Sequence, residues 1–299
     1  MNLDRKTILV TGGTGFIGSA LVKSLVRAGA RVRTFDDGSR GRDARLGDTA
    51  KEIERIEGDI RDAGAVAKAI RGADSVAHLA YVNGTEFFYS KPELVLEVAV
   101  KGMMNVLDGC MAHGVRDLVL ASSSEVYQTP ASIPTDERVA LSVPDPLNPR
   151  FSYGGGKIIS ELLALNYGRK HFDRVVIFRP HNVYGPDMGW EHVIPQLVLR
   201  VHALAARQPE GDLKVEIQGT GKETRAFIHV ADAVEGIRTI MESGAHLGIY
   251  HVGEMREVSI DWLLRRIGQE LGRQVEPIPT PLAAGSTPPI ACFRLPLVS

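Results

Sequence analysis

Short apolar segments alternate with helical segments along the first part of the chain. Strand-like runs lie at residues 7–10, 31–35, 53–57, 75–79 and 118–121, and helical patterns lie between them at residues 15–28, 63–70 and 93–111. Strands that alternate with helices form a parallel sheet with helices on both faces. A helix at 154–170 and a strand at 174–178 complete this pattern. We therefore expect a doubly wound α/β domain over residues 1–180.

The pattern changes after residue 180, where the chain becomes rich in proline. Helical patterns follow at residues 194–206, 232–243 and 260–271, and strand-like runs at 214–217, 226–229 and 248–252. These elements predict a smaller C-terminal lobe over residues 181–299, intermingled with the end of the first domain. The last stretch, residues 277–299, contains several prolines and shows no helical period.

Composition and charge exclude several classes of protein. The chain has 35 Lys and Arg against 36 Asp and Glu, a net charge of −1, which argues against binding to nucleic acid or to an anionic membrane. Its two cysteines, Cys110 and Cys292, form neither a disulfide framework nor a cluster with zinc spacing, so we expect no metal. No apolar run approaches the roughly 18 residues of a membrane-spanning helix, and the first run is too short for a signal peptide. We expect a cytoplasmic protein.

A glycine-rich loop directly follows the first strand and opens the first helix. Its sequence, Thr-Gly-Gly-Thr-Gly-Phe-Ile-Gly, places Gly12, Gly15 and Gly18 at the GxxGxxG spacing around Phe16 and Ile17. Glycine permits the tight turn, lets a pyrophosphate approach the backbone and allows close packing of helix on strand. The helix N-terminus adds free N–H groups and the positive end of its dipole. With a strand before it and a helix after it, this loop predicts a dinucleotide site in a Rossmann domain.

Acidic residues follow the second and third strands. Asp36 stands where a dinucleotide-binding domain carries the carboxylate that binds ribose hydroxyls, and this carboxylate repels a 2′-phosphate. We therefore expect NAD rather than NADP, although Arg40 and Arg42 follow closely and argue for caution. Asp59, followed by Ile60, ends the third strand, where it can bind the adenine amino group or simply form a strand-end turn.

Three residues of the second half of this domain point to proton transfer. Tyr153 and Lys157 are four residues apart and therefore project from one face of a helix. A nearby ammonium and a nicotinamide cation both lower the pKa of a phenol, so Tyr153 can remove a hydroxyl proton while a hydride leaves the same carbon. Ser123, in the serine-rich end of the strand at 118–121, can hold the substrate oxygen.

Together these motifs resemble the extended short-chain dehydrogenase/reductase family, which contains nucleotide-sugar epimerases, dehydratases and decarboxylases. The matching segments are TGGTGFIG (11–18), GDI (58–60), HLA (78–80), SSSEVY (122–127), YGGGK (153–157), RPHNVYGP (179–186) and TRAF (224–227). The resemblance implies a tightly held NAD that is reduced and reoxidised within one turnover. It also implies a 4-keto sugar intermediate, a nucleotide-diphosphate sugar as substrate, a substrate-binding C-terminal lobe and a homodimer.

The resemblance implies a role for each matching residue. Tyr153 would be the base, Ser123 its hydroxyl partner and Lys157 the residue that tunes Tyr153 and binds the nicotinamide ribose. Ser124, Asn182 and Arg225 would bind substrate, the last two at its diphosphate, for which a guanidinium is well suited. The cofactor-binding residues would be Gly12, Gly15, Phe16, Ile17, Gly18, Asp36, Asp59, Ile60, Leu79 and Lys157.

Three positions depart from the family pattern. Ala99 stands where many members have Asn, Tyr81 replaces a small residue after His-Leu-Ala, and His251 stands where Asn is common. These differences weaken any transfer of fine substrate specificity but leave the Tyr153–Lys157 pair intact.

Glu125 bears on which reaction the chain catalyses. Oxidation at C4 acidifies C5, and loss of a C6 hydroxyl or carboxylate then needs a second acid or base beside Tyr153. Dehydratases and decarboxylases of the family often carry Glu at this place, whereas simple epimerases carry a small residue. We therefore expect a 4,6-dehydratase or a decarboxylase, in which Glu125 is catalytic. Glu125 can instead be a cap or an ion-pair partner at the strand end, and a 4-epimerase stays the alternative.

Two further expectations concern the class and the end of the chain. A non-catalytic NAD-binding regulator on the same fold is the rival class, since fold alone does not establish catalysis. The chain from Thr287 matches no strand and helix of the kind that finishes the substrate lobe in relatives, which suggests a truncated or altered C-terminus.

Overall fold

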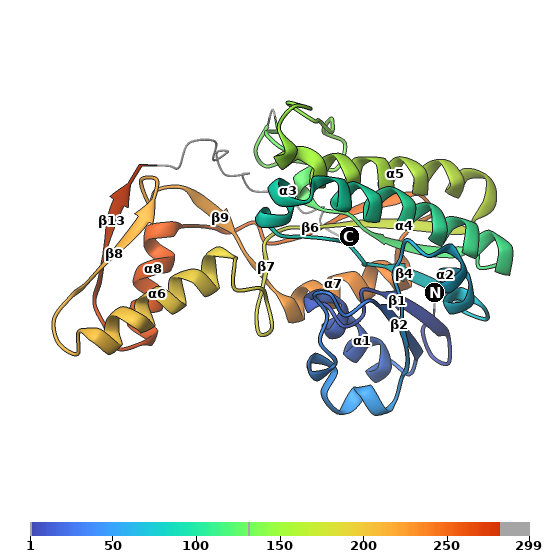
Figure 1. Ribbon diagram of the computed structural model, residues 1–299, viewed down its shortest axis with the longest axis horizontal. Coiled ribbons are helices and arrows are strands. Elements are labelled where there is room, and N and C mark those ends of the chain that lie inside the picture. The colour runs from blue at the N-terminus through green and yellow to red at the C-terminus, as the bar shows by residue number, and fades with distance from the viewer. Residues whose placement is uncertain (1, 131, 282–299) are drawn as a thin grey trace.

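The structure is a computed structural model that describes residues 2–130 and 132–281 (Figure 1). A seven-stranded sheet lies at its centre, with the strands in the order β3-β2-β1-β4-β5-β6-β11 and every neighbouring pair parallel. The strands are β1 (Thr7–Thr11), β2 (Arg31–Asp36), β3 (Glu54–Glu57), β4 (Ser75–His78), β5 (Asp117–Ala121), β6 (Arg174–Pro180) and β11 (Gly248–Val252). This topology confirms the doubly wound fold. The strand order reverses between β1 and β4, where such sheets open a crevice for ligands.

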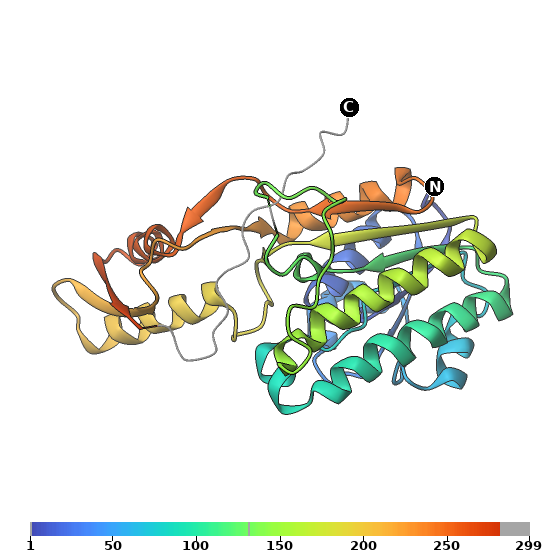
Figure 2. The same ribbon diagram turned by 90° about the horizontal axis from the view of Figure 1, so that it is seen from above.

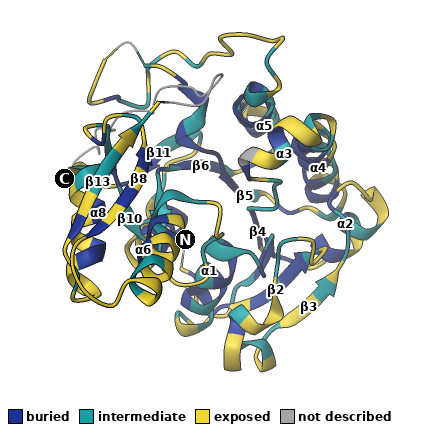
Figure 3. Cartoon of the chain, turned by 60° about the vertical axis from the view of Figure 1, so that its left-hand side comes forward, coloured by how far each residue is buried: buried dark blue, intermediate teal, exposed yellow. Residues whose placement is uncertain are grey.

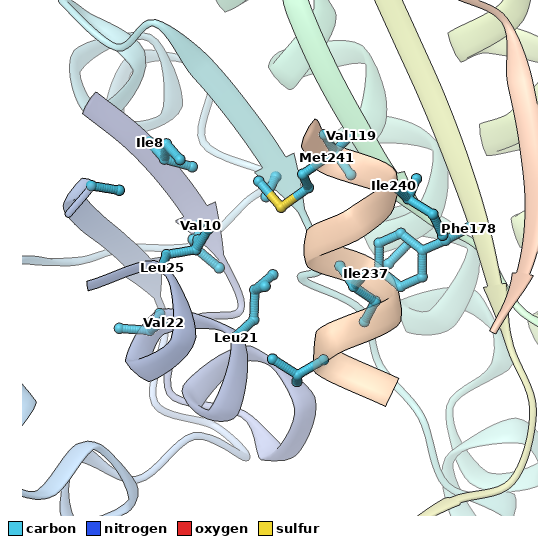
Figure 4. Packing of buried hydrophobic residues seen from close by; sticks show 14 of the residues in the cluster. Ile8, Val10, Leu21, Val22, Leu25, Val119, Phe178, Ile237, Ile240 and Met241 are labelled. Carbon is cyan, nitrogen blue, oxygen red and sulfur yellow. The ribbon is translucent and has the colours of Figure 1, made fainter. Parts of the chain in front are cut away.

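Helices cover both faces of this sheet (Figure 2). One face carries α1 (Phe16–Arg27) and α7 (Val230–Ser243), and the other carries α2 (Ala63–Ile70), α4 (Pro92–His113) and α5 (Ser152–His171). The strands are mostly buried, whereas the helices expose their outer sides (Figure 3). Figure 4 shows the core beneath α1 and α7. It contains Ile8, Val10, Leu21, Val22, Leu25, Val119, Phe178, Ile237, Ile240 and Met241.

The elements that lead to the site begin at local signals in the sequence. A short helix, α3 (Thr85–Ser90), precedes α4, which begins at Pro92, where a missing N–H costs nothing, and ends at Gly114 in the left-handed conformation (φ 68°). A short 3-10 helix (Pro149–Phe151), capped by the side chain of Asn148, leads directly into α5. Helix α5 therefore begins two residues before the start at 154 that the sequence pattern predicts, and Tyr153 lies in its first turn.

The second part of the chain forms a smaller lobe beside the sheet (Figure 1). It contains α6 (Val193–Arg207), β8 (Leu213–Gln218), α8 (Ile260–Glu270) and β13 (Val275–Thr280), and β8 alternates buried and exposed residues. The parallel partner of β8 is β13, a strand that the sequence pattern does not predict because two of its residues, Pro277 and Pro279, lack the N–H group of an ordinary strand. The expectation about the chain from Thr287 lies outside the described residues.

The two parts are connected more than once. Helix α7 and strand β11 return to the central sheet, where β11 pairs with β6. Short strands form the connections: β7 (Val183–Tyr184) pairs with β10 (Ile228–His229), and β9 (Thr224–Ala226) pairs with β12 (Glu257–Ser259). The single strand predicted at 226–229 is thus two short strands in two different pairs. Two further 3-10 helices lie at Asp43–Lys51 and Ser124–Val126.

Candidate active site

A cleft of about 260 Å³ opens at the carboxyl ends of the central strands. Its wall contains every residue that the sequence predicts to bind the cofactor, namely Gly12, Gly15, Phe16, Ile17, Gly18, Asp36, Asp59, Ile60, Leu79 and Lys157. Tyr153 also lines this cleft. The structure therefore brings the glycine loop, the acidic strand ends and the Tyr153–Lys157 pair into one cavity.

The glycine loop packs closely against its neighbours because it lacks side chains at two positions. Gly12 has φ +72°, and a Cβ there would lie 2.8 Å from the backbone nitrogen of Ala80. A Cβ on Gly18 would lie 2.0 Å from the carbonyl oxygen of Gly12. Gly15 precedes α1. No side chain caps the first turn of this helix, so the N–H groups of that turn stay available for an anion. This loop fits the pyrophosphate of a dinucleotide.

Asp36 holds the end of β2 against the glycine loop. Its carboxylate accepts hydrogen bonds from the backbone N–H groups of Thr14 and Gly38, both at 3.0 Å. Arg40 pairs with Glu191, and its guanidinium lies 5.3 Å from the ring centre of Phe87. One of the two arginines that argued for caution about NADP, Arg40, is therefore engaged by a carboxylate.

Asp59 lies at the end of β3, where Arg61 holds it. The Asp59 carboxylate accepts from the backbone N–H of Arg61 at 2.8 Å and from its guanidinium at 2.6 Å. These bonds lower the pKa of Asp59. The carboxylate is thus ionised at neutral pH and lies in the cleft wall, where it can accept a hydrogen bond.

Tyr153 and Lys157 lie one turn apart on α5, and both are buried, with 8% and 4% of their surface exposed. Burial raises the pKa of Tyr153 to about 12, while its hydrogen bond with Ser123 and the charge of Arg150 act in the opposite direction. Burial also lowers the pKa of Lys157 to about 7. The expected fall in the Tyr153 pKa is therefore not found in the protein by itself. One reason is that the Lys157 ammonium donates to the carbonyl of Ala121 at 2.7 Å rather than to the phenol. Another is that the expected fall in pKa also included the charge of a nicotinamide cation.

A buried hydroxyl in the cleft wall lacks a hydrogen-bond partner among the described residues. The Oγ of Ser122 lies in the cleft wall and forms no hydrogen bond with another described residue. A buried hydroxyl without a partner is costly, so a polar ligand that fills the cleft would satisfy it. This orphaned atom supports the fit of a polar cofactor beside Lys157.

Glu125 forms an ion pair with Arg150 across 3.3 Å. An ion pair is one of the two roles that the sequence leaves open for Glu125, and its partner Arg150 is not among the predicted residues. Arg150 precedes Tyr153 by three positions, so that one turn of helix brings it beside Tyr153, and this spacing was the available signal. The charge of Glu125 raises the pKa of Tyr153 and that of Arg150 lowers it, so both act on the phenol.

The residues predicted to bind substrate lie outside the wall of this cleft. Ser124 is buried at the start of a short 3-10 helix. The Asn182 amide donates to the carbonyl of Ala226 at 3.0 Å, and the Arg225 guanidinium donates to the carbonyl of Thr224 at 2.8 Å. Asn182 and Arg225 thus lie on the connections to the smaller lobe, and their contact with substrate stays a prediction.

The three departures from the family pattern have different surroundings. Tyr81 lines the cleft, and its ring lies edge-on to that of Tyr153, with 5.1 Å between centres. Ala99 is buried on α4. The imidazole of His251 and the hydroxyl of Tyr127 share a hydrogen bond of 2.8 Å. This bond belongs to a buried network that includes Arg179.

Two further searches bear on function. No group of three or more His, Cys, Asp or Glu side chains that could hold a metal ion occurs within residues 2–130 and 132–281. In the same part of the chain, no helix has the length and apolar character needed to cross a membrane.

Comparison with known proteins shows what the whole chain is similar to. A sequence model of the NAD dependent epimerase/dehydratase family matches residues 8–253. UDP-glucuronic acid decarboxylase 1 of Xenopus tropicalis is 32% identical over 271 residues, which cover 90% of this chain and 61% of that protein. dTDP-glucose 4,6-dehydratase of Mycobacterium tuberculosis is 32% identical over 240 residues, 79% of this chain and 69% of that protein. The structure of UDP-glucose 4-epimerase from Thermus thermophilus in complex with NAD superposes with a TM-score of 0.79 at 26% identity, covering 96% of this chain and 90% of that chain. The chain spans about three fifths of the Xenopus relative.

Proposed function

Because the chain belongs to the NAD-dependent epimerase/dehydratase family, we propose that it modifies a nucleotide-diphosphate sugar through a 4-keto intermediate, as a 4,6-dehydratase or a decarboxylase. The observation that carries this proposal is the charged pair Glu125–Arg150, which acts on a phenol that is hydrogen-bonded to Ser123. A carboxylate beside the base gives the site a second group that can move a proton. The relatives named above as decarboxylase and dehydratase support this choice.

In this mechanism Tyr153 takes the proton from the C4 hydroxyl of the sugar, and the Ser123 hydroxyl holds the same oxygen. NAD held by the glycine loop, Asp36 and Lys157 would supply the hydride chemistry at C4. Lys157 stabilises the phenolate by its charge and binds the ribose next to the nicotinamide. The low exposure of Tyr153 and Lys157 excludes water from the reacting carbon.

Glu125 acts after C4 is oxidised. In a dehydratase its carboxylate removes the proton from C5 and delivers a proton to the departing C6 hydroxyl. In a decarboxylase, C5 gains a proton after the C6 carboxylate leaves as carbon dioxide, and Glu125 supplies it. Arg150, 3.3 Å from Glu125, keeps this carboxylate in place between proton transfers.

A 4-epimerase is the second candidate. If Glu125 only holds Arg150, the site has no second acid or base, and simple epimerisation needs none beyond Tyr153. The Thermus epimerase shares the fold over nearly the whole of this chain.

We further propose a homodimer formed through α4 and α5. These two helices pack side by side, and their outer surface carries exposed apolar side chains, Leu96, Ile159 and Leu162. Exposed apolar patches on helices favour association. Light scattering of the purified protein tests this, and Leu162→Glu should yield a monomer. A cytoplasmic location also stays a prediction, for which cell fractionation is the test.

Incubation with UDP-, dTDP- and GDP-linked sugars, followed by mass spectrometry, tests the reaction. Loss of water indicates a dehydratase, loss of carbon dioxide a decarboxylase, and a new product of unchanged mass an epimerase. Tyr153→Phe is the control, because it keeps the ring but removes the base. No product from any donor, with NAD bound normally, would support a non-catalytic NAD-binding regulator and overturn the proposal.

A further inference from the structure

Tyr81 contacts both members of the Tyr153–Lys157 pair. Its ring face lies beneath the Lys157 ammonium, with 3.7 Å from Nζ to the ring centre. Its hydroxyl donates a hydrogen bond to the backbone carbonyl of Tyr153 at 3.3 Å. The ring of Tyr153 itself is farther from the ammonium, at 5.9 Å. Tyr81 therefore provides the aromatic surface nearest to this lysine.

Gly156 makes room for Tyr81. A Cβ on Gly156 would lie 2.3 Å from the Tyr81 hydroxyl oxygen and 2.8 Å from the Cβ of Ala99. Gly156 belongs to α5 and Ala99 to α4, which pack against each other. A side chain at position 156 would therefore compete with the Tyr81 hydroxyl for space. The glycine at 156 and the large residue at 81 thus form one complementary arrangement.

The Lys157 ammonium lacks a carboxylate partner in the part of the chain that the structure describes. The charged and titratable groups around it are Tyr81, Tyr153, His78 on β4 and Glu161 on α5. Glu161 is held by the guanidinium of Arg179, which takes both of its oxygens. Burial makes the pKa of His78 fall to about 3, so this imidazole is neutral. The hydrogen bond to Ala121 and the face of Tyr81 are therefore the direct contacts that favour a charged Lys157.

We propose that Tyr81 is a positioning residue for Lys157: its ring face binds the ammonium and its hydroxyl fixes the ring to the first turn of α5. The ring and the Ala121 carbonyl thus hold the ammonium from two sides in the wall of the cleft. The ring thus stabilises the ammonium of Lys157 as a carboxylate would. It does so without adding a negative charge that would raise the pKa of Tyr153. This role in turnover rests on the proposed function.

A series of isosteric rings tests the proposal without changing the packing. Phenylalanine and its mono-, di- and trifluorinated analogues are placed at position 81 of the NAD-containing enzyme. Each fluorine withdraws charge from the ring face and weakens its attraction for a cation. Tyr81→Phe is the reference member, since the hydroxyl contact is absent throughout the series. We expect kcat to fall stepwise with each fluorine, by roughly tenfold in total, with KM for the nucleotide sugar unchanged. A kcat that does not vary with fluorination would overturn the proposal.

The charge state of Lys157 gives a second readout that needs no substrate. The chemical shift of its ε-carbon in lysine-labelled protein, assigned with Lys157→Met, reports the pKa. We expect this pKa, about 7 with Tyr81 in place, to fall along the fluorinated series and to fall furthest in Tyr81→Leu. A purely structural Tyr81 would leave it the same in every folded variant.

The two readouts distinguish their causes of failure. If no nucleotide sugar is converted but the Lys157 pKa follows ring charge, the proposed function fails and the positioning role stands. If turnover is normal and neither kcat nor the pKa follows ring charge, the positioning role fails alone. If Tyr81→Leu does not fold, the fluorinated series decides the matter, since its members share one shape.

Discussion

The carboxylate of Glu125 lies 3.3 Å from the guanidinium of Arg150, and the two charges act on Tyr153 in opposite directions. One residue comes from the loop after β5 and the other from the turn that leads into α5. The pair thus joins the two segments that carry Ser123 and Tyr153. Since Glu125 and Arg150 act on Tyr153 in opposite directions, substitution of each residue has its own expected result.

Glu125→Gln should permit oxidation at C4 but slow the step that follows. Glutamine keeps the shape and can still bind Arg150, but it cannot transfer a proton. For a lost acid or base we expect a decrease in kcat on the order of 10²–10⁴, with accumulation of the 4-keto sugar measured by mass spectrometry. Unchanged turnover would instead assign Glu125 a structural role and favour the epimerase.

Charge changes at the pair should move the acidic limb of the pH–rate profile in opposite directions. Activity needs the Tyr153 phenolate, so it is lost as pH falls through the pKa of Tyr153. Arg150→Met removes a cation that lowers this pKa, so the limb should move to higher pH, whereas Glu125→Gln should move it to lower pH. Arg138→Met, in the exposed pair with Asp136, is the control and should leave the limb in place. Shifts of the same sign would contradict this account.

Asp36→Asn should weaken the preference for NAD over NADP. Thr14 and Gly38 donate to different oxygens of Asp36, so asparagine keeps only one of these two bonds, and it no longer repels a 2′-phosphate. We expect the dissociation constant of NADP divided by that of NAD to fall about tenfold, as for one charge-assisted hydrogen bond. Both constants are measured by calorimetry on nucleotide-free protein. The same change at Asp37 serves as the comparison, and a larger effect there would transfer the role to Asp37.

Gly18→Ala should abolish retention of the dinucleotide. The added methyl group would lie 2.0 Å from the Gly12 carbonyl oxygen, which forces the glycine loop and α1 apart. We expect little bound NAD after purification, measured by absorbance of the released nucleotide. Gly64→Ala is the matched control in α2, since its methyl group would meet only the Asp62 carboxylate at 3.4 Å. Normal NAD content in Gly18→Ala would refute this reading of the loop.

Arg179→Met should destabilise the fold strongly. The Arg179 guanidinium takes both oxygens of Glu161, and each side chain is only 2% exposed, so the change leaves a buried carboxylate without its partner. Loss of one member of a buried pair costs roughly 3–5 kcal/mol in free energy of unfolding, which urea denaturation measures. Arg265→Met, in an exposed pair with Asp261, should cost less than about 1 kcal/mol. Equal decreases in the free energy of unfolding for the two variants would mean that burial does not set the contribution of the Arg179–Glu161 pair to stability.

Much of the fold was predictable because its signals are local. The glycine loop between β1 and α1 and the alternation of strands and helices require only nearby residues, and both were read correctly. Strand β13 was missed because its prolines resemble a loop and its pairing with β8 depends on residues far away in the sequence.

The site was predictable in part for the same reason. The spacing of Tyr153 and Lys157 defines a helix face, but the partner of Glu125 depended on how the turn before α5 folds. The position of Tyr81 against Lys157 needed the packing of α4 on α5, which no spacing reveals. The pKa of Tyr153 differed from expectation because burial, which the sequence does not show, exceeds the effect of the nearby cations.

The ion pair between Arg40 and Glu191 joins residues 151 positions apart. Arg40 belongs to the loop that follows Asp36, and Glu191 directly precedes the helix that enters the smaller lobe. Because Arg40 lies in the wall of the cleft, this wall is tied at one point by a bridge that the two halves of the chain build together. The cleft that the sequence places in the first domain is thus completed by a residue of the second.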